Sequence, residues 1–310
     1  MIMYILIILT ILAIIFLLFI KICSEIALNK AFYKKKKNKE DAFNSLRKRG
    51  ILDESIYNKF NFQDVSIISK DNLILKGHLI ENYKDSNNYI ILVHGYTANY
   101  HIHIPFVPLF IKEGFNILLV DERNHGESQG DFLSYGYFER DDLDLWINYL
   151  EKRKGQKLFL GLHGQSMGAA TVLMCGARNP KVRFIIEDCG YNSAKEIIKD
   201  QCLKKMKFMP FKFVYYLLRR KVRKLYNFDL DKVTPMEDIL KSDVPILFIH
   251  GNSDDYVPCR MSEEMYKKRK NPKDDILIVE KADHLMAYDL EKEEYERKVH
   301  DFIEKVRNTV

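Results

Sequence analysis

Five residues, Gly164-Gln165-Ser166-Met167-Gly168, most strongly constrain the fold of this chain, because they join two segments of different character. The apolar run 157–162 before them is typical of a buried strand, and 169–174 after them is typical of a helix. A serine in such a sharp strand-to-helix turn projects its hydroxyl above the sheet edge, and the glycines leave room for the bend. The helix that follows points backbone N–H groups at whatever the serine attacks. The pattern therefore predicts an α/β sheet with a reactive serine at its edge.

Short apolar runs alternate with helix-like segments from residue 61 onward. The runs predicted as strands are 62–69, 73–80, 89–93, 115–120, 158–162, 182–186, 246–250 and 276–279. The segments predicted as helices are 104–113, 138–152, 167–177, 261–269 and 288–306. Apart from a first hairpin, this order predicts a mostly parallel sheet with helices on both faces. In such a sheet the functional groups gather at the carboxyl ends of the strands.

Two later loops carry the partners that a nucleophilic serine needs: a base within hydrogen-bond reach, and an acid that orients the base. The strand 246–250 runs into a loop that contains Asp254 and Asp255, and the strand 276–279 runs into a loop that ends in His284. Both loops follow the carboxyl end of a strand, as Ser166 does. The chain order Ser, Asp, His is the order expected for this type of sheet. Asp188, at the end of another strand, is a further candidate for the acid.

These motifs together resemble the α/β-hydrolase superfamily of serine esterases and lipases. Within it, the chain is similar to a membrane-anchored bacterial branch related to Bem46-like and cinnamoyl-ester-hydrolase-like proteins. The resemblance covers residues 61–310 and also rests on His94-Gly95-Tyr96 and on the loop 121–128. It implies the α/β-hydrolase fold.

The resemblance also implies a role for each matching residue. Ser166 is expected to be the nucleophile, and His284 the base that takes its proton and later returns it to the leaving group. The pattern H-G-x-x-D-x-x-V-P places the orienting acid at Asp254 rather than at Asp255. The backbone N–H groups of Tyr96 and Met167 are expected to form an oxyanion hole.

No cofactor or metal ion is expected. The histidines at 94, 101, 103 and 125 match no metal-ligand spacing, and His94 and His125 are expected to shape loops instead. Gln165 departs from the commonest form of the serine motif, in which many relatives carry His or Asp. That position tolerates variation, so the assignment of the serine stands.

The first 20 residues carry no charged side chain, and in a helix they would cover roughly 30 Å, the hydrocarbon thickness of a bilayer. A cleaved signal peptide is disfavoured, because no basic region precedes the run and no A-x-A-like site follows it. Residues 1–22 are therefore predicted to be an uncleaved membrane anchor, and 23–60 a basic linker. Seven lysines lie between 21 and 39, which predicts a cytoplasmic main domain. These lysines could also rest on anionic headgroups.

An insertion over residues 191–232 separates the two parts of the predicted hydrolase core, 61–190 and 233–310. From Lys195 to Lys224 it holds eleven Lys/Arg against two acidic residues, with apolar residues at 206, 208, 209, 211 and 213–218. The simplest interpretation is a helical cap whose apolar face covers the core. Contact with an anionic membrane or an acidic substrate is the alternative. Nucleic-acid binding is disfavoured, since nothing else in the chain resembles a nucleic-acid module.

We therefore expect a membrane-anchored serine hydrolase that acts on a small-molecule or lipid-like carboxylic ester or thioester. Two alternatives stay open. One is an acyltransferase or peptidase that uses the same three residues, and the other is a non-catalytic, membrane-bound scaffold of the same fold.

Overall fold

A computed structural model describes residues 2–33, 35–155, 157–205 and 210–308. Its centre is an eight-stranded sheet with the order β1-β2-β4-β3-β5-β6-β7-β8. The strands are β1 (Gln63–Ile68), β2 (Ile74–Ile80), β3 (Asn88–Val93), β4 (Asn116–Val120), β5 (Phe159–Gln165), β6 (Val182–Asp188), β7 (Ile246–Gly251) and β8 (Asp275–Val279). The pairs β1–β2 and β2–β4 are antiparallel, and all other neighbouring pairs are parallel.

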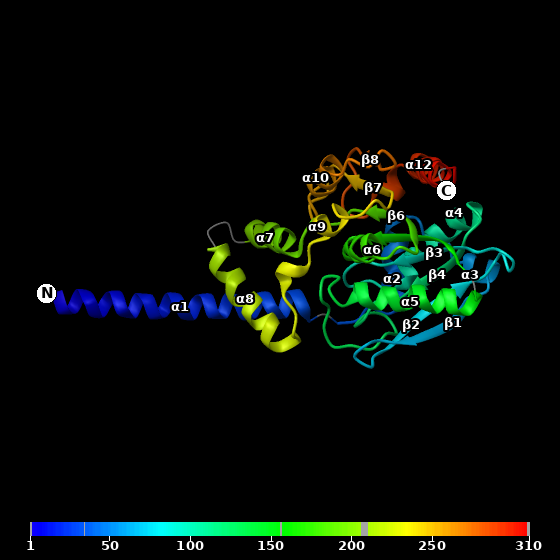
Figure 1. The fold of residues 1–310 in the computed structure, drawn as a ribbon. Coiled ribbons are helices and arrows are strands. Elements are labelled where there is room, and N and C mark those ends of the chain that lie inside the picture. Colours follow the sequence, from blue (N-terminus) through cyan, green and yellow to red (C-terminus); the bar gives the residue numbers. More distant parts are fainter. Residues whose placement is uncertain (1, 34, 156, 206–209, 309–310) are drawn as a thin grey trace.

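Helices cover both faces of this sheet (Figure 1). The first face carries η1 (Tyr100–Phe106), α4 (Val107–Lys112), α11 (Ala287–Leu290) and α12 (Lys292–Arg307), and the second carries α5 (Glu139–Lys154), α6 (Met167–Arg178), α9 (Pro235–Ile239) and α10 (Arg260–Lys268). Because both faces are covered, the central strands are buried along nearly their whole length, which explains their continuous apolar runs. The predicted α/β class is confirmed.

Two predicted helices differ from the expected form. Over 104–113 the chain first forms the 3₁₀ helix η1, and the α-helix starts only at Val107. Pro105 lacks the N–H that an α-helix interior needs, so it falls in the 3₁₀ helix before α4. Pro108 falls in the first turn of α4, where a proline is tolerated. The C-terminal segment predicted over 288–306 is divided into the short α11 and the longer α12, which begins at Lys292.

Residues 23–60, predicted as a basic linker with some helical character, are mostly helical, and several of them are buried. The apolar N-terminal helix α1 runs from Ile2 to Phe32, and α2 (Lys39–Arg49) and α3 (Ile56–Lys59) follow it. Asn38 caps α2: its Oδ1 accepts from the Asp41 N–H at 2.9 Å, and Asp41 Oδ2 accepts from the Asn38 N–H at 3.0 Å. Two segments of the expected linker thus pack against the folded domain, through α2 and through the end of α1.

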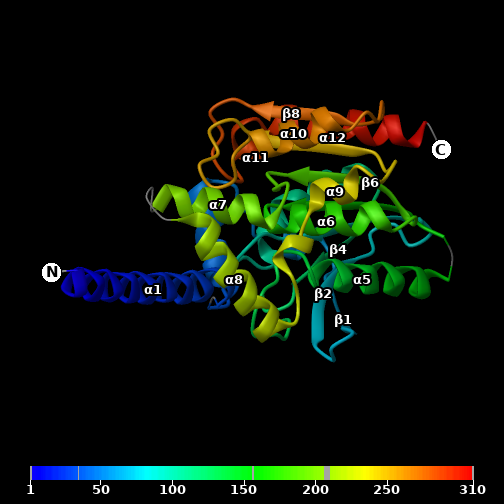
Figure 2. The ribbon, with the colours of Figure 1, turned by 60° about the vertical axis from the view of Figure 1, so that its left-hand side comes forward.

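The insertion between β6 and β7 holds α7 (Ala194–Lys205), α8 (Phe211–Tyr226) and the short 3₁₀ helix η2 (Leu230–Lys232). Figures 1 and 2 both show α7 and α8 beside the end of α1 that meets the domain. Buried residues of α1, α7 and α8 form one apolar cluster with residues of α6 and α10. The apolar positions 206, 208 and 209 of the predicted cap lie outside the described residues.

Candidate active site

Ser166 occupies the turn between β5 and α6 in a strained backbone conformation, with φ 56° and ψ −114°. A non-glycine residue in such a conformation costs on the order of 1–3 kcal/mol. The surrounding structure must therefore hold Ser166 in this conformation. The flanking glycines explain how the turn fits. A Cβ on Gly164 would lie 2.3 Å from the Gly168 carbonyl oxygen, and a Cβ on Gly168 would lie 2.1 Å from the Val93 carbonyl oxygen. Both glycines are therefore required by close backbone contacts.

The structure brings Ser166, His284 and Asp254 together in one chain of hydrogen bonds. His284 Nε2 lies 3.0 Å from Ser166 Oγ, and His284 Nδ1 lies 2.7 Å from Asp254 Oδ2. With Nδ1–H donating to the carboxylate, the free lone pair of Nε2 faces the serine hydroxyl and can accept its proton. The three side chains come from the loops after β5, β7 and β8, all at the carboxyl edge of the sheet.

The carboxylate of Asp254 is held in its charged form. Its Oδ1 accepts from the backbone N–H groups of Tyr256 and Val257, each at 2.8 Å. Burial alone would raise the pKa of Asp254, but hydrogen bonds from His250 and His284 outweigh burial, and this pKa lies well below its usual value. A permanently ionised Asp254 can fix the His284 tautomer and stabilise a positive charge on its ring.

The two other candidate acids lie in different surroundings. The Asp255 side chain is 97% exposed and lies 3.6 Å from the Lys204 ammonium. Asp188 is buried, but its Oδ2 accepts hydrogen bonds from Gln165 Nε2 at 2.8 Å and Tyr295 Oη at 3.3 Å. Of the three acidic residues, Asp254 is thus the one hydrogen-bonded to His284.

The segment after β3 lies directly against Ser166, where an oxyanion hole is expected. A Cβ on Gly95 would lie 3.0 Å from Ser166 Cβ and 3.6 Å from Ser166 Oγ. Tyr96 follows this glycine. Met167 is the first residue of α6, so its N–H has no acceptor within the helix. Both expected donors therefore belong to backbone segments that adjoin the serine.

Two buried histidines hold this segment in place. His94 Nε2 accepts from the Glu122 N–H at 3.1 Å, so its Nδ1–H donates to the Gly95 carbonyl at 2.9 Å. His125 Nε2 accepts from the Thr97 N–H at 3.1 Å. Burial lowers the pKa of both rings, which keeps them neutral and able to accept these bonds. The expectation that they shape loops agrees with these contacts.

The other two histidines of the β3–α4 region are also neutral. Burial lowers the pKa of His101 to about 3 and that of His103 well below its usual value. Within the described ranges, one group of donor atoms is compact enough to hold a metal ion: Cys189, Asp254 and His284, within 4.8 Å of one another. Burial raises the pKa of the Cys189 thiol, and the other two side chains are already hydrogen-bonded, so this group is poorly prepared for a metal.

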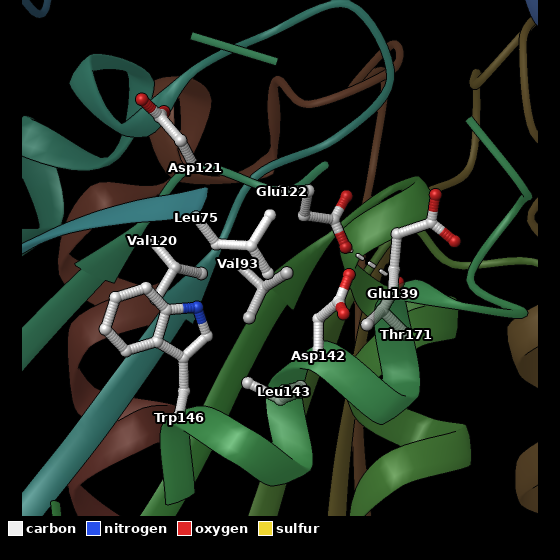
Figure 3. A pocket seen from close by; sticks show the side chains of 10 residues that line it. All are labelled: Leu75, Val93, Val120, Asp121, Glu122, Glu139, Asp142, Leu143, Trp146 and Thr171. Carbon is white, nitrogen blue, oxygen red and sulfur yellow. Dashed lines mark hydrogen bonds between the residues drawn. The ribbon is translucent and has the colours of Figure 1, made fainter. Parts of the chain in front are cut away.

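A small cavity lies beneath the loop that follows β4 (Figure 3). Its volume is about 10 Å³, which suits about one water molecule and no substrate. Glu122 Oε1 accepts from the Thr171 hydroxyl at 2.9 Å, whereas its Oε2 has no hydrogen-bond partner among the described residues. Burial, with Glu139 nearby, raises the pKa of Glu122 well above its usual value, so this carboxyl is neutral. The cavity lies against the loop residues Asp121 and Glu122, and Ser166 is not among its lining residues.

Comparisons with known proteins agree with this fold. The family model described as serine aminopeptidase, S33, matches residues 84–206. The uncharacterized protein YqkD of Bacillus subtilis is 31% identical over 242 residues, which cover 76% of this chain and 77% of YqkD. The chain belongs to the α/β-hydrolase superfamily.

Two solved structures show the same fold. The Pyrococcus furiosus esterase Pf2001 superimposes with a TM-score of 0.66 at 23% identity, covering 82% of this chain and 96% of the esterase. A CIB-like hydrolase from Thermoplasma acidophilum gives a TM-score of 0.52 at 20% identity, covering 79% of this chain and 98% of that protein.

Sequence reasoning missed two features of the site. The first is His250, whose Nε2 lies 3.2 Å from Asp254 Oδ2. Its place in the H-G-x-x-D pattern was the available signal. The second is the end of α1. Phe32 packs edge-on against Tyr135 at 5.4 Å between ring centroids, and Tyr135 stacks on Tyr96 at 6.3 Å. No pattern in the sequence pointed to this aromatic contact.

Proposed function

We propose that this protein is a serine hydrolase that cleaves carboxylic esters or thioesters through an acyl-enzyme intermediate. Ser166 Oγ attacks the carbonyl carbon while His284 Nε2 takes the hydroxyl proton. The protonated ring then gives this proton to the leaving alcohol or thiol, and an acyl group stays on Ser166. A water molecule, deprotonated by the same nitrogen, attacks the acyl group. The carboxylic acid leaves, and the serine recovers its proton.

The developing negative charge on the carbonyl oxygen needs donors that are already in place. The N–H groups of Tyr96 and Met167 are proposed for this role. Both are backbone groups, so they need no rearrangement when the charge forms. Removing one such donor in other enzymes costs about 10²–10³ in rate.

The observation that carries the proposal is the continuous hydrogen-bonded chain from Ser166 Oγ through His284 to the ionised Asp254. The test uses the full chain in detergent, a fluorophosphonate probe, and p-nitrophenyl esters of rising acyl length. We expect labelling and hydrolysis by the natural chain and loss of both in Ser166→Ala and His284→Ala. Ser253→Ala is the matched control, since Ser253 is an exposed serine in the Asp254 loop.

A folded natural chain that neither binds the probe nor hydrolyses any ester would contradict the proposal and favour the non-catalytic scaffold. Equal labelling of the natural chain and Ser166→Ala would show that another residue is the nucleophile. The acyl length that gives the highest kcat/KM would define the size of the acyl site.

A peptidase is the second candidate, because the matching family model is described as a serine aminopeptidase. The same three residues would serve, and the leaving group would be an amine. Aminoacyl p-nitroanilides distinguish the two. Hydrolysis of an anilide with a kcat/KM above that of the best ester would favour the peptidase. Alcohol or amine acceptors, with product analysis, test for acyl transfer in the same assay.

The apolar helix α1 is proposed to anchor this enzyme in a membrane. Its Ile2–Ile26 part is long and apolar enough to span a bilayer by length and composition. A signal sequence passes the same test, but cleavage behind the apolar stretch would remove or free the end of α1, where Leu28 and Phe32 are buried in the domain. An uncleaved anchor keeps these contacts.

The lysines that follow the apolar stretch favour a cytoplasmic position for the domain. The anchor is tested by membrane fractionation. We expect protein of full-length mass in the membrane pellet, and we expect the protein to leave the pellet when residues 2–19 are deleted. Resistance of the domain to external protease in intact cells would test the side of the membrane. Digestion in intact cells would place the domain outside the cytoplasm.

A further inference from the structure

Helix α8 presents two different faces. Its inward face is apolar: Val214, Leu218 and Val222 are buried. Its outward face combines large apolar side chains with basic ones. Phe213 is 43% exposed and Tyr216 is 51% exposed, and Lys212, Arg220 and Lys224 are exposed around them. A helix with aromatic and basic residues on its free face is typical of a membrane interface.

The basic side chains of α8 divide into paired and unpaired groups. Arg219 and Arg223 both bind the Asp229 carboxylate, and Lys221 binds the Glu25 carboxylate of α1. For Lys212, Arg220 and Lys224, by contrast, no carboxylate lies within ion-pair distance in the described part of the chain. The outward charges are therefore available to anions outside the protein.

The end of α1 fixes α8 in position. The Lys221 ammonium also donates to Ser24 Oγ at 3.1 Å, and Ile20, Cys23 and Ser24 are all buried. Both views of the ribbon show α8 crossing the domain end of α1 (Figures 1 and 2). The position of α8 along the anchor is thus determined by packing and by an ion pair.

That position coincides with the edge of a bilayer. Every residue of α1 from Ile2 to Phe19 is exposed, and burial begins at Ile20. At about 1.5 Å of rise per residue, the exposed stretch covers roughly 27 Å, close to the hydrocarbon thickness of roughly 30 Å. With this stretch in the hydrocarbon layer, the α1–α8 contact lies at the level of the lipid headgroups.

We propose that α8 lies on the surface of an anionic membrane. In this arrangement Phe213 and Tyr216 enter the interface between headgroups and acyl chains. Lys212, Arg220 and Lys224 contact lipid phosphates and carboxylates, as basic residues close to an anionic leaflet do. This inference rests on the proposed anchor and is independent of ester cleavage.

The test places tryptophan at single positions of the full chain in lipid nanodiscs. The lipids carry bromine near the upper end of their acyl chains and include or omit phosphatidylserine. The natural chain has one tryptophan, Trp146, which is buried in the core and gives the same background in every variant. Tyr216→Trp reports on α8 and Leu9→Trp on the anchor. Tyr83→Trp is the matched control. It is an equally conservative change at an exposed tyrosine that precedes the first residue of β3.

We expect bromine to quench the added emission of Tyr216→Trp and of Leu9→Trp, and to leave Tyr83→Trp unquenched. Quenching of Tyr216→Trp should be stronger with phosphatidylserine, and Lys212→Gln, Arg220→Gln and Lys224→Gln together should remove that gain. If Leu9→Trp is quenched and Tyr216→Trp behaves like Tyr83→Trp, the anchor stands and the α8 proposal is wrong. If Leu9→Trp is unquenched, the anchor and this proposal both fail.

Equal quenching of Tyr216→Trp with and without phosphatidylserine would overturn the assignment of the basic side chains to anionic lipid. Ester hydrolysis in detergent, measured on the same variants, shows that each is folded. It should stay at the natural level, because none of these positions contacts Ser166 or His284. A failure of the membrane proposal is thereby distinguished from a failure of the proposed enzyme activity.

Discussion

His250 Nε2 lies 3.2 Å from Oδ2 of Asp254, the same carboxylate oxygen that His284 contacts. The His250 ring is itself fixed, because its Nδ1 lies 2.7 Å from the Ser262 hydroxyl, which donates to Glu187 Oε1 at 2.5 Å. Asp254 is therefore held between a histidine that faces the serine and a second, fully buried histidine. His250 touches no reacting atom, so its role in the proposed reaction would be to position Asp254.

Replacement of His250 by glutamine tests this positioning role. A hydrogen bond to a charged group is worth about 1.5–3 kcal/mol, so His250→Gln should lower kcat about tenfold or more. KM should change little, since His250 lies behind Asp254 and away from the substrate. His300→Gln is the control, a histidine with a 55% exposed side chain on α12. Equal kcat values for the two variants would show that His250 does not position Asp254.

The identity of the orienting acid can be tested with two neighbouring aspartates. Asp254→Asn should lower kcat by about 10³–10⁴, because an amide at this place no longer fixes the reactive His284 tautomer. Asp255→Asn changes the next residue in the chain in the same way, but this side chain is exposed and should have an effect below about twofold. Steady-state kinetics with the best p-nitrophenyl ester measure both. A larger loss in Asp255→Asn would refute the assignment.

The ionisation of Glu187 makes stability depend on pH. Burial raises the pKa of Glu187 to about 7, although His250, the Ser262 hydroxyl and the Gly190 N–H lower it in part. In the unfolded chain the pKa is about 4.3. Between these values the folded state keeps a proton that the unfolded state releases, so stability should fall as pH rises from about 5 to 7 and level off above.

Glu187→Gln keeps the shape of the side chain and removes its ionisation. We therefore expect its melting temperature to fall less than that of the natural chain over this pH range. The raised pKa of His250 acts with the same sign at higher pH, so some dependence should persist in the variant. Thermal unfolding followed by circular dichroism in detergent, in buffers from pH 5 to pH 8, gives the comparison. Parallel curves for the two proteins would show that Glu187 does not titrate there.

The sequence predicts the sheet well, because each central strand is buried on both faces and so appears as a continuous apolar run. The run 89–93, for example, agrees with β3. Ser166, Asp254 and His284 were also identifiable, since parallel strands carry the residues that follow them to one edge. In these cases a local pattern determines a position in space.

Contacts between distant segments left no such pattern. The segment 23–60 is rich in lysine, and its apolar residues do not show which parts of the chain Phe32 and Phe43 will be buried against. At His250 the H-G-x-x-D pattern is a local signal, but the pattern alone does not show that this ring contacts the Asp254 carboxylate. Packing of this kind depends on side chains that come from elsewhere in the chain.

The last prediction concerns the contact between α1 and the candidate active site. Phe32 is fully buried, stacks on Tyr226 at 5.7 Å between ring centroids, and packs edge-on against Tyr135. Replacing a buried phenylalanine by alanine usually costs about 3–5 kcal/mol. For a domain of this size, Phe32→Ala should lower the melting temperature by about 5–10 °C. Phe16→Ala is the control, because Phe16 is 53% exposed within the apolar stretch of the same helix.

Phe32→Ala should also lower ester hydrolysis at temperatures where the variant is still folded. Tyr135, which has φ 56°, stacks on Tyr96, whose backbone N–H is proposed to bind the oxyanion, so a cavity at Phe32 allows this aromatic group to shift. We expect kcat to fall while fluorophosphonate labelling of Ser166 slows by a similar factor. An unchanged kcat together with a lowered melting temperature would mean that Phe32 stabilises the fold without affecting the oxyanion site. Phe16→Ala should match the natural chain in both measurements, since in a membrane or detergent its side chain contacts no part of the catalytic domain.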